Sequence, residues 1–204
     1  MRKSWMRLAA VTLLAGYAYG VEAGAEAKVG EAAPDFTLTD VLGNEHSLSD
    51  YEGQFVVLEW INHGCPFVRK FYDVGEMQRL QEKYTDKGLA WLVICSSKPG
   101  SQGYYTPEEA ARVSEEKEAK HTAYLYDAPG DVGRLYGAQV TPHMYVIDPD
   151  GMLIYQGAID SIRSANPEDI ERAENYVVSA LTEAKAGEEV STPTTRPYGC
   201  TVKY

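Results

Sequence analysis

The sequence predicts an α/β domain built on a central mixed β-sheet flanked by helices, and three observations support this class. Two nearly continuous apolar runs, residues 55–61 and 89–95, are typical of strands buried on both faces. Helical stretches alternate with the strands along the chain, as in other α/β domains. Asp-Pro-Asp-Gly at residues 148–151 separates two short apolar runs and predicts a hairpin near the end of the domain.

The elements follow one another from about residue 30. A turn at Gly43-Asn44 and a serine-rich segment ending at Gly53 separate the first two strands, and the sheet is expected to carry an N-terminal β-hairpin extension. We expect strands at residues 36–38, 55–61, 89–95, 123–126, 144–147 and 153–156, and helices at 66–87, from 106 onward, at 131–136 and at 167–186.

Local signals indicate where the helices begin and break. Gly75 predicts an interruption of the helix at residues 66–87. Thr-Pro-Glu-Glu at residues 106–109 is a capping box with proline at the first helical position. Asn-Pro at residues 166–167 opens the last helix in a similar way.

Composition and charge exclude several kinds of partner. The 204 residues fit one domain with a tail, and 44% apolar with 24% charged residues is ordinary globular usage. The formal net charge of -11 argues against a nucleic-acid-binding protein, whose surface would be basic. It also argues against an anionic membrane surface as partner.

Residues 1–25 have the layout of a secretory signal peptide. Arg2, Lys3 and Arg7 give a positive start, residues 8–19 are apolar, and small residues follow. The apolar run is short for a bilayer span, so we expect cleavage and no stable membrane insertion afterwards, with an uncleaved anchor as the alternative. The predicted location is periplasmic or secreted, where disulfides persist.

Cys65 is the first candidate site residue. It lies within residues 62–68, which connect the first buried strand to the helix after it, and Pro66 suits the first helical turn. A cysteine at a helix N-terminus meets unpaired N–H groups that favour its reactive thiolate form. The carboxyl end of a strand is also where open α/β sheets place their sites. A capping or packing cysteine is the alternative.

Taken together, these motifs resemble the thioredoxin-like superfamily. Trp60, Cys65-Pro66, Thr141-Pro142 and the hairpin at residues 148–151 match its pattern, and Ala-Pro-Asp-Phe-Thr-Leu at residues 33–38 resembles its alkyl hydroperoxide reductase/thiol-specific antioxidant (redoxin) branch. The resemblance implies a thioredoxin fold over residues 28–186, with a redox cysteine at Cys65. It also implies a cis peptide bond at Thr141-Pro142 facing that cysteine, and no organic cofactor.

The chain departs from the family pattern in two ways. A C-x-x-C motif needs a second cysteine at position 68, where this chain has Val68. The P-x-x-x-T-x-x-C motif of peroxiredoxins needs Pro and Thr where this chain has Leu58 and Asn62. The sequence therefore resembles a peroxiredoxin-like subgroup with a single active-site cysteine.

Cys200 is the preferred redox partner of Cys65. It lies in a tail, residues 187–204, that also carries Pro197, Tyr198 and Tyr204, and whose composition is typical of a docked segment. A docked tail would bring Cys200 to Cys65 as a structural bridge or as a resolving cysteine. An intermolecular or free Cys200 remains open.

Cys95 is the second-choice partner. It ends the apolar run at residues 89–95, where a small buried core cysteine is the favoured interpretation. Its strand should nevertheless end on the same side of the sheet as the strand leading to Cys65.

The histidines suggest a second class of function. His63 is expected as a solvent-facing loop residue, with stabilisation of a thiolate as the alternative, and strand alternation should turn His143 away from Cys65. His46 and His121 lie beside turns and are expected at the surface. Together, Cys65, His63 and His143 raise a copper-binding alternative, although a C-x-x-x-C copper motif would need cysteine at Arg69.

We therefore predict an exported thiol–disulfide oxidoreductase or peroxiredoxin-like antioxidant protein. Cys65 would attack an oxidised sulfur or a peroxide oxygen, Cys200 would resolve the product, and Thr141-Pro142 would shape the approach. The expected partner is a thiol or disulfide protein or a small peroxide, with neither metal nor organic cofactor. A copper-binding or non-catalytic thioredoxin-fold binding module is the alternative.

Overall fold

The computed structural model describes residues 26–204, and the signal peptide expected at residues 1–25 lies outside them. The strands are β1 (Thr37–Asp40), β2 (Glu45–Ser47), β3 (Val56–Trp60), β4 (Ala90–Cys95), β5 (Ala123–Tyr126), β6 (Val140–Thr141), β7 (His143–Ile147), β8 (Leu153–Gly157) and β9 (Cys200–Thr201). The α-helices are α1 (Pro66–Tyr72), α2 (Glu76–Thr85), α3 (Pro107–Glu116), α4 (Asp131–Leu135) and α5 (Tyr176–Lys185). Two 3₁₀ helices, η1 (Leu48–Tyr51) and η2 (Pro167–Arg172), complete the set.

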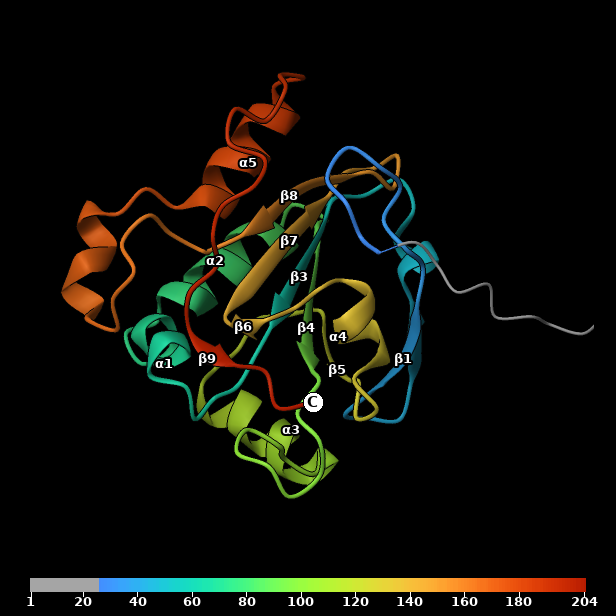
Figure 1. Cartoon of the computed structure of the whole chain (residues 1–204), viewed down its shortest axis with the longest axis vertical. Helices are drawn as coiled ribbons and strands as arrows, with labels where there is room; N and C mark the ends of the chain where they lie inside the picture. The colour runs from blue at the N-terminus through green and yellow to red at the C-terminus, as the bar shows by residue number, and fades with distance from the viewer. Residues whose placement is uncertain (1–25) are drawn as a thin grey trace, which may run out of the picture.

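The strands form a mixed sheet of the expected class. Its order is β2-β1-β5-β4-β3-β7-β8, and β6 and β9 form a separate two-stranded ladder (Figure 1). β4 pairs in parallel with both β3 and β5, whereas β7 runs antiparallel to β3 and β8. The β1–β2 hairpin is the predicted N-terminal extension, and it joins the sheet through β5. The arrangement is a thioredoxin-like fold.

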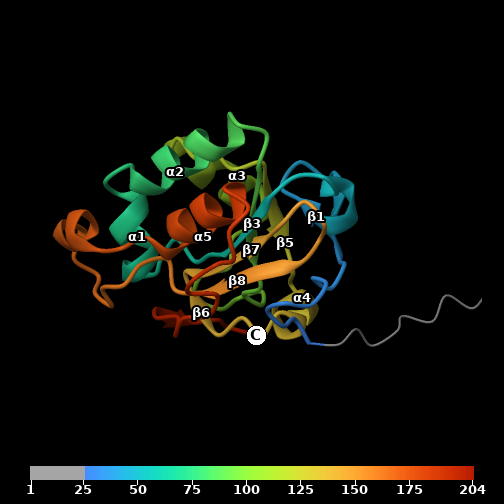
Figure 2. The same cartoon turned by 90° about the horizontal axis from the view of Figure 1, so that it is seen from above.

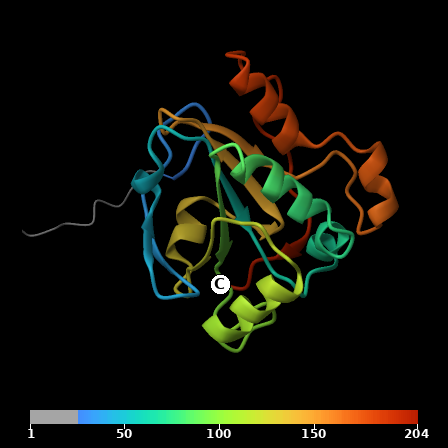
Figure 3. The ribbon, with the colours of Figure 1, turned by 180° about the vertical axis from the view of Figure 1, so that it is seen from behind.

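Helices cover both faces of the sheet and divide the core in two. One core cluster contains Val57, Val68 and Leu80, and it lies between the sheet and α1, α2 and α5. The other contains Leu58 and Val132, and it lies between the sheet and α4. Figure 2 shows these layers from above, and Figure 3 shows α2 crossing the far face of the sheet.

Strands β3 and β4 are buried along their whole length, as the apolar runs predict. Side chains of alternate residues enter opposite core clusters, so neither face of these central strands meets water. The strand β3 therefore holds the loop that follows it, residues 61–65, in a fixed position at the edge of the sheet.

The helix expected at residues 66–87 breaks where glycine predicts it. Gly75 adopts a left-handed conformation with φ of 77°, which glycine accepts without steric cost, and α2 begins after it.

The helix expected at residues 167–186 is wrong as a single element. Asn166 caps η2, but Ala173 returns to an extended conformation. The side chain of Asn175 then accepts a hydrogen bond from the backbone N–H of Val178 at 3.1 Å and starts α5. A second N-cap residue inside the segment therefore divides it.

The tail at residues 187–204 is a docked part of the domain. It passes β8, where Thr195 N donates to Gln156 O at 3.1 Å, and then forms β9 beside β6, as the red segment of Figure 1 shows. The ladder of β6 and β9 was not predicted. In residues 26–204, no helix has both the length and the apolar content needed to cross a membrane.

Candidate active site

Cys65 occupies the N-cap position of α1, as the sequence predicts. Its backbone is extended, Pro66 begins the helix, and the whole residue is buried. Asn62 shapes the loop before it, because its side-chain oxygen accepts from Gly64 N at 2.8 Å and its carbonyl accepts from Cys65 N at 2.9 Å. The thiol is thereby held at the carboxyl end of β3.

The bond between Thr141 and Pro142 is cis, as the resemblance implies. It lies directly against Cys65, whose Sγ donates a hydrogen bond to the carbonyl oxygen of Thr141 at 3.1 Å. Thr141 is buried and forms the end of β6, so this carbonyl has a fixed position.

Cys200 completes the group from the tail. In the antiparallel ladder of β6 and β9 it stands directly opposite Thr141, whose hydroxyl donates weakly to Cys200 O at 3.5 Å. Burial, a hydrogen bond to Cys65 and the charge of that neighbour raise the pKa of the Cys200 thiol to about 12. Cys200 therefore keeps its proton at neutral pH. All four predicted site residues, Cys65, Thr141, Pro142 and Cys200, lie together.

The thiols of all three cysteines are free in this structure. At the position of the second cysteine of a C-x-x-C motif, α1 carries Val68, whose side chain is fully buried in the core. The second sulfur beside Cys65 comes instead from the tail, which is distant in sequence.

Two tyrosines fix the tail on either side of Cys200. Tyr198 is buried, and its hydroxyl donates to the carboxylate of Asp160. On the other side, Tyr204 donates to the carbonyl of Ala138 at 2.6 Å, and its ring lies 4.8 Å from the guanidinium carbon of Arg134. Cys200 is therefore held from both directions.

A groove of about 560 Å³ opens beside the pair. Phe67 of α1, Val140 of β6 and Gly199 of the tail line it, and Arg163 and Arg196 stand at its exposed side. The groove thus borders both elements that carry the cysteines, although neither cysteine lines it.

Cys95 behaves as the core cysteine that the sequence favours. It is buried at the end of β4, where its Sγ contacts Gly103 O at 3.5 Å. Burial raises the pKa of this thiol, so it is a poor nucleophile.

The expectation that His63 faces solvent is wrong. The residue is buried, and its ring lies 5.2 Å from that of Tyr72 and 6.1 Å from those of Tyr105 and Tyr124. Burial lowers the pKa of His63 to about 4, so the ring is neutral at pH 7. Tertiary packing of three aromatic side chains, which a loop sequence does not reveal, explains the difference.

The other histidines do not converge on Cys65 either. His143 turns to the opposite face, as strand alternation predicts, and its Nδ1 lies 3.1 Å from the hydroxyl oxygen of Tyr145. His46 and His121 are partly buried rather than at the surface, because His46 bonds Asp40 and His121 packs on Tyr124. Within residues 26–204, no group of three His, Cys, Asp or Glu side chains is arranged to hold a metal ion.

Glu59 is a buried acid that the sequence analysis passed over. It lies near the end of β3, and its Oε2 accepts from Trp91 Nε1 at 2.8 Å and from Tyr72 OH at 3.3 Å. Burial raises the pKa of Glu59 to about 7 despite these bonds. An acidic residue inside an otherwise apolar strand was the available signal.

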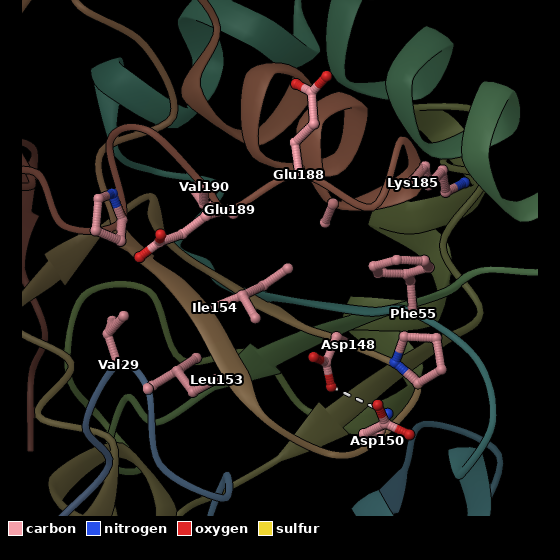
Figure 4. A pocket seen from close by; sticks show the side chains of 14 residues that line it. Val29, Phe55, Asp148, Asp150, Leu153, Ile154, Lys185, Glu188, Glu189 and Val190 are labelled. Carbon is pink, nitrogen blue, oxygen red and sulfur yellow. Dashed lines mark hydrogen bonds between the residues drawn. The ribbon is translucent and has the colours of Figure 1, made fainter.

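A larger cavity, of about 710 Å³, lies away from the cysteines (Figure 4). Phe55 and Ile154 line its apolar part, while Glu188 and Glu189 approach from the tail. Phe55 immediately precedes β3, whereas Cys65 follows its other end, so this cavity is separate from the thiol pair.

Known proteins match this chain over most of the described domain. A thiol-disulfide oxidoreductase ResA from Geobacillus kaustophilus is 29% identical over 127 residues, which are 60% of this chain and 65% of that protein. The alignment thus spans less than two thirds of that relative. The thioredoxin-like protein YneN from Bacillus subtilis is 26% identical over 159 residues, 75% of this chain and 88% of the relative.

Solved structures agree with the fold. An uncharacterized conserved protein from Geobacillus kaustophilus superposes with a TM-score of 0.75 at 30% identity, covering 87% of this chain and 92% of that one. A putative thiol:disulfide interchange protein DsbE from Chlorobium tepidum gives 0.55 at 27% identity, covering 76% and 99%. The family model described as AhpC/TSA family matches residues 29–156. The chain therefore belongs to the AhpC/TSA family of thioredoxin-like proteins.

Proposed function

We propose that this protein is a thiol–disulfide oxidoreductase whose redox pair is Cys65 and Cys200. The observation that carries the proposal is that Cys200 stands opposite Thr141, whose carbonyl accepts from the Cys65 thiol beside the cis peptide bond. Relatives that are named thiol-disulfide oxidoreductases support the same chemistry.

Cys65 is the nucleophile of the proposed reaction. It stands at the N-terminus of α1, whereas the raised pKa of Cys200 keeps that residue protonated. The Cys65 thiolate attacks one sulfur of a partner disulfide. The partner S–S bond breaks, a mixed disulfide with Cys65 forms, and the other partner sulfur leaves and takes a proton.

Cys200 completes the exchange in a second step. Its sulfur, after losing its proton to the departing thiolate, attacks Sγ of Cys65 in the mixed disulfide. The bond to the partner breaks and a Cys65–Cys200 disulfide forms. Two electrons have then passed from this protein to its partner, and the reverse sequence oxidises a partner dithiol.

Thr141 and Pro142 direct the partner in this proposal. The tail runs antiparallel to β6 and pairs Cys200 with Thr141 and Thr201 with Val140. An extended partner segment that displaces the tail would meet the same backbone groups, with its sulfur next to Cys65.

Disulfide exchange is better supported than peroxide reduction as the reaction of this protein. A peroxide would give a sulfenic acid at Cys65, with an alcohol or water leaving, and Cys200 would then condense with loss of water. Leu58 and Asn62, however, stand where peroxiredoxins carry the Pro and Thr of their peroxide pocket.

We also propose that the protein acts in the periplasm or outside the cell. The supporting observation is the basic, apolar and small-residue order of residues 1–25. N-terminal sequencing of the protein from an expressing cell tests this, and a retained Met1 would contradict it.

The reaction is tested with insulin as a generic protein disulfide and dithiothreitol as the electron source. We expect Cys65→Ser to abolish catalysed insulin reduction. When the reduced Cys200→Ser variant is mixed with insulin without dithiothreitol, it should retain a mixed disulfide through Cys65. Cys95→Ser is the matched control, with activity close to that of the unaltered protein. Full turnover by Cys65→Ser would overturn the proposal.

A further inference from the structure

A buried ion pair ties the tail to the helix that begins at Cys65. Lys70 lies on α1 and donates from Nζ to Oδ2 of Asp160 at 2.6 Å. Both side chains are almost completely buried, at 0% and 2% exposure. When charged groups are removed from water to this extent, each of their hydrogen-bond donors and acceptors needs a partner, because a buried donor or acceptor without one carries a large free-energy penalty.

Tyr198 fills the last positions in this cluster. The Lys70 ammonium has three donors, and they are directed to Asp160, to Ile162 O at 3.2 Å and to Tyr198 OH at 3.3 Å. The Tyr198 hydroxyl in turn donates to Oδ1 of Asp160. Burial and this carboxylate hold the pKa of Tyr198 well above its ordinary value, so the phenol remains a donor.

Only Gly199 separates Tyr198 from Cys200. A Cβ atom on Gly199 would lie 2.0 Å from the carbonyl oxygen of Thr141, so the tail backbone packs directly on the peptide that faces Cys65. Two residues of extended chain span about 7 Å, which leaves little slack between the phenol and the thiol. The Tyr198 ring also packs edge-on against Phe67 of α1 at 5.7 Å.

The docked tail closes the site that it completes. Cys65 is fully buried with the tail in place, so a partner sulfur reaches it only after the segment at Tyr198–Cys200 moves aside. Resolution by Cys200 needs the opposite movement. Docking of the tail therefore opposes the attack of Cys65 on a partner and promotes the later attack of Cys200 on Cys65.

We propose that Tyr198, held by the buried Lys70–Asp160 pair, is the positioning residue that sets both the exposure of Cys65 and the approach of Cys200. The inference rests on the proposed redox pair, since it assigns the control of that pair. It predicts that weakening the Tyr198 contact changes the two steps in opposite directions. A general loosening of the fold would not do this.

The two steps are separable with dithionitrobenzoate, an aromatic disulfide. Cys65 attacks one of its sulfurs and releases one coloured thiolate, leaving a mixed disulfide. Cys200 then attacks Cys65, releases the second coloured thiolate and closes the Cys65–Cys200 bond. Stopped-flow absorbance resolves the two releases on the reduced full-length protein.

Tyr198→Phe removes the hydroxyl and keeps the ring against Phe67. Loss of a hydrogen bond to a charged group corresponds to about a tenfold change in the docked population. We expect the first release to be about tenfold faster and the second to be several-fold slower. Tyr136→Phe is the matched control, because it removes a buried hydroxyl that bonds Pro34 O at 2.6 Å rather than the Lys70–Asp160 pair. Its two rates should be unchanged.

Tyr198→Ala should change both rates further in the same directions. If this variant is less stable, the rate of Cys65 alkylation provides a second measurement of the exposure of that thiol. If Tyr198→Phe accelerates both releases or changes neither, the positioning role is wrong. Cys200→Ser separates this from the proposed function. If Cys200→Ser still gives the second release at the normal rate, the assignment of Cys65 and Cys200 as the redox pair is wrong. If Cys200→Ser abolishes the second release while Tyr198→Phe has no effect, the redox pair stands and only the positioning role of Tyr198 is wrong.

Discussion

The thiol of Cys200 is a neighbour of the thiol of Cys65, although one lies in the tail and the other begins the first α-helix. The cis peptide at Thr141 joins them, since its carbonyl accepts from Cys65 and its residue pairs with Cys200 in the β6–β9 ladder. A dithiol that most thioredoxin-like proteins would build within one turn of helix is thus divided between two distant segments. Access to one cysteine is consequently coupled to docking of the other.

Gly199→Ala should detach the tail near the site. Its methyl group would meet Thr141 O at 2.0 Å, and the φ of 150° at this position suits glycine. Relief of that clash moves Cys200 away, so we expect iodoacetamide to alkylate Cys65 about tenfold faster or more. Gly187→Ala is the control, because Gly187 also has positive φ but no atom within 4 Å of the added methyl. Equal alkylation rates for both variants would show that the tail does not shield Cys65.

Lys70→Met should strongly destabilise the domain. It leaves the Asp160 carboxylate buried without its cationic partner, for which we expect a loss of about 3–5 kcal/mol in the free energy of unfolding. Urea denaturation measures this. Arg69→Met removes the exposed neighbouring pair with Asp73, and should change stability by less than about 1 kcal/mol. Similar losses in the free energy of unfolding for the two variants would contradict a stabilising role for the buried Lys70–Asp160 pair.

Glu59 should make stability fall as pH rises. Below pH 4.5 the carboxyl is protonated in both the folded and the unfolded chain, so it adds no pH dependence. Between 4.5 and about 7 the unfolded chain ionises first, which favours unfolding by up to about 3 kcal/mol. We expect Glu59→Gln to remove this decline in urea denaturation midpoints. Glu76→Gln, at the start of α2 where the carboxylate pairs with Arg79, should retain the decline. A decline that persists in Glu59→Gln would show that other groups cause it.

His63→Phe should preserve insulin reduction. The neutral ring is buried among tyrosines, and neither ring nitrogen has a hydrogen-bond partner in the described chain. Because the folded pKa is about 4 and the ordinary one 6.5, stability falls as pH decreases from 6.5 to 4, by up to about 3 kcal/mol. Phenylalanine should lessen that acid loss. A large loss of activity in a stably folded variant would mean that His63 acts on the thiol.

The central sheet and the position of Cys65 were predictable because they depend on local pattern. Residues 89–95 are apolar throughout and residues 55–61 are apolar except for Glu59, and burial on both faces leaves few other options for such runs. The Cys-Pro pair at a strand-to-helix loop likewise carries its own signal. The Thr-Pro-Glu-Glu cap at residues 106–109 forms the complete capping box that its sequence indicates.

The remaining features depend on tertiary contacts that no local pattern encodes. β6 and β9 are two residues long each, and they exist because the tail meets Thr141. The burial of His63 and the bonds of Lys70 arise from side chains far away in sequence. The composition of the tail indicated docking, but not that Tyr198 would find a buried ion pair.

The most direct test of this account is peptide mapping by mass spectrometry under non-reducing conditions, before and after one equivalent of oxidant. The account predicts that the reduced protein has three free thiols, and that oxidation joins Cys65 to Cys200 while Cys95 stays free. A Cys65–Cys95 bridge, a disulfide between chains, or an overoxidised Cys65 beside a free Cys200 would contradict it.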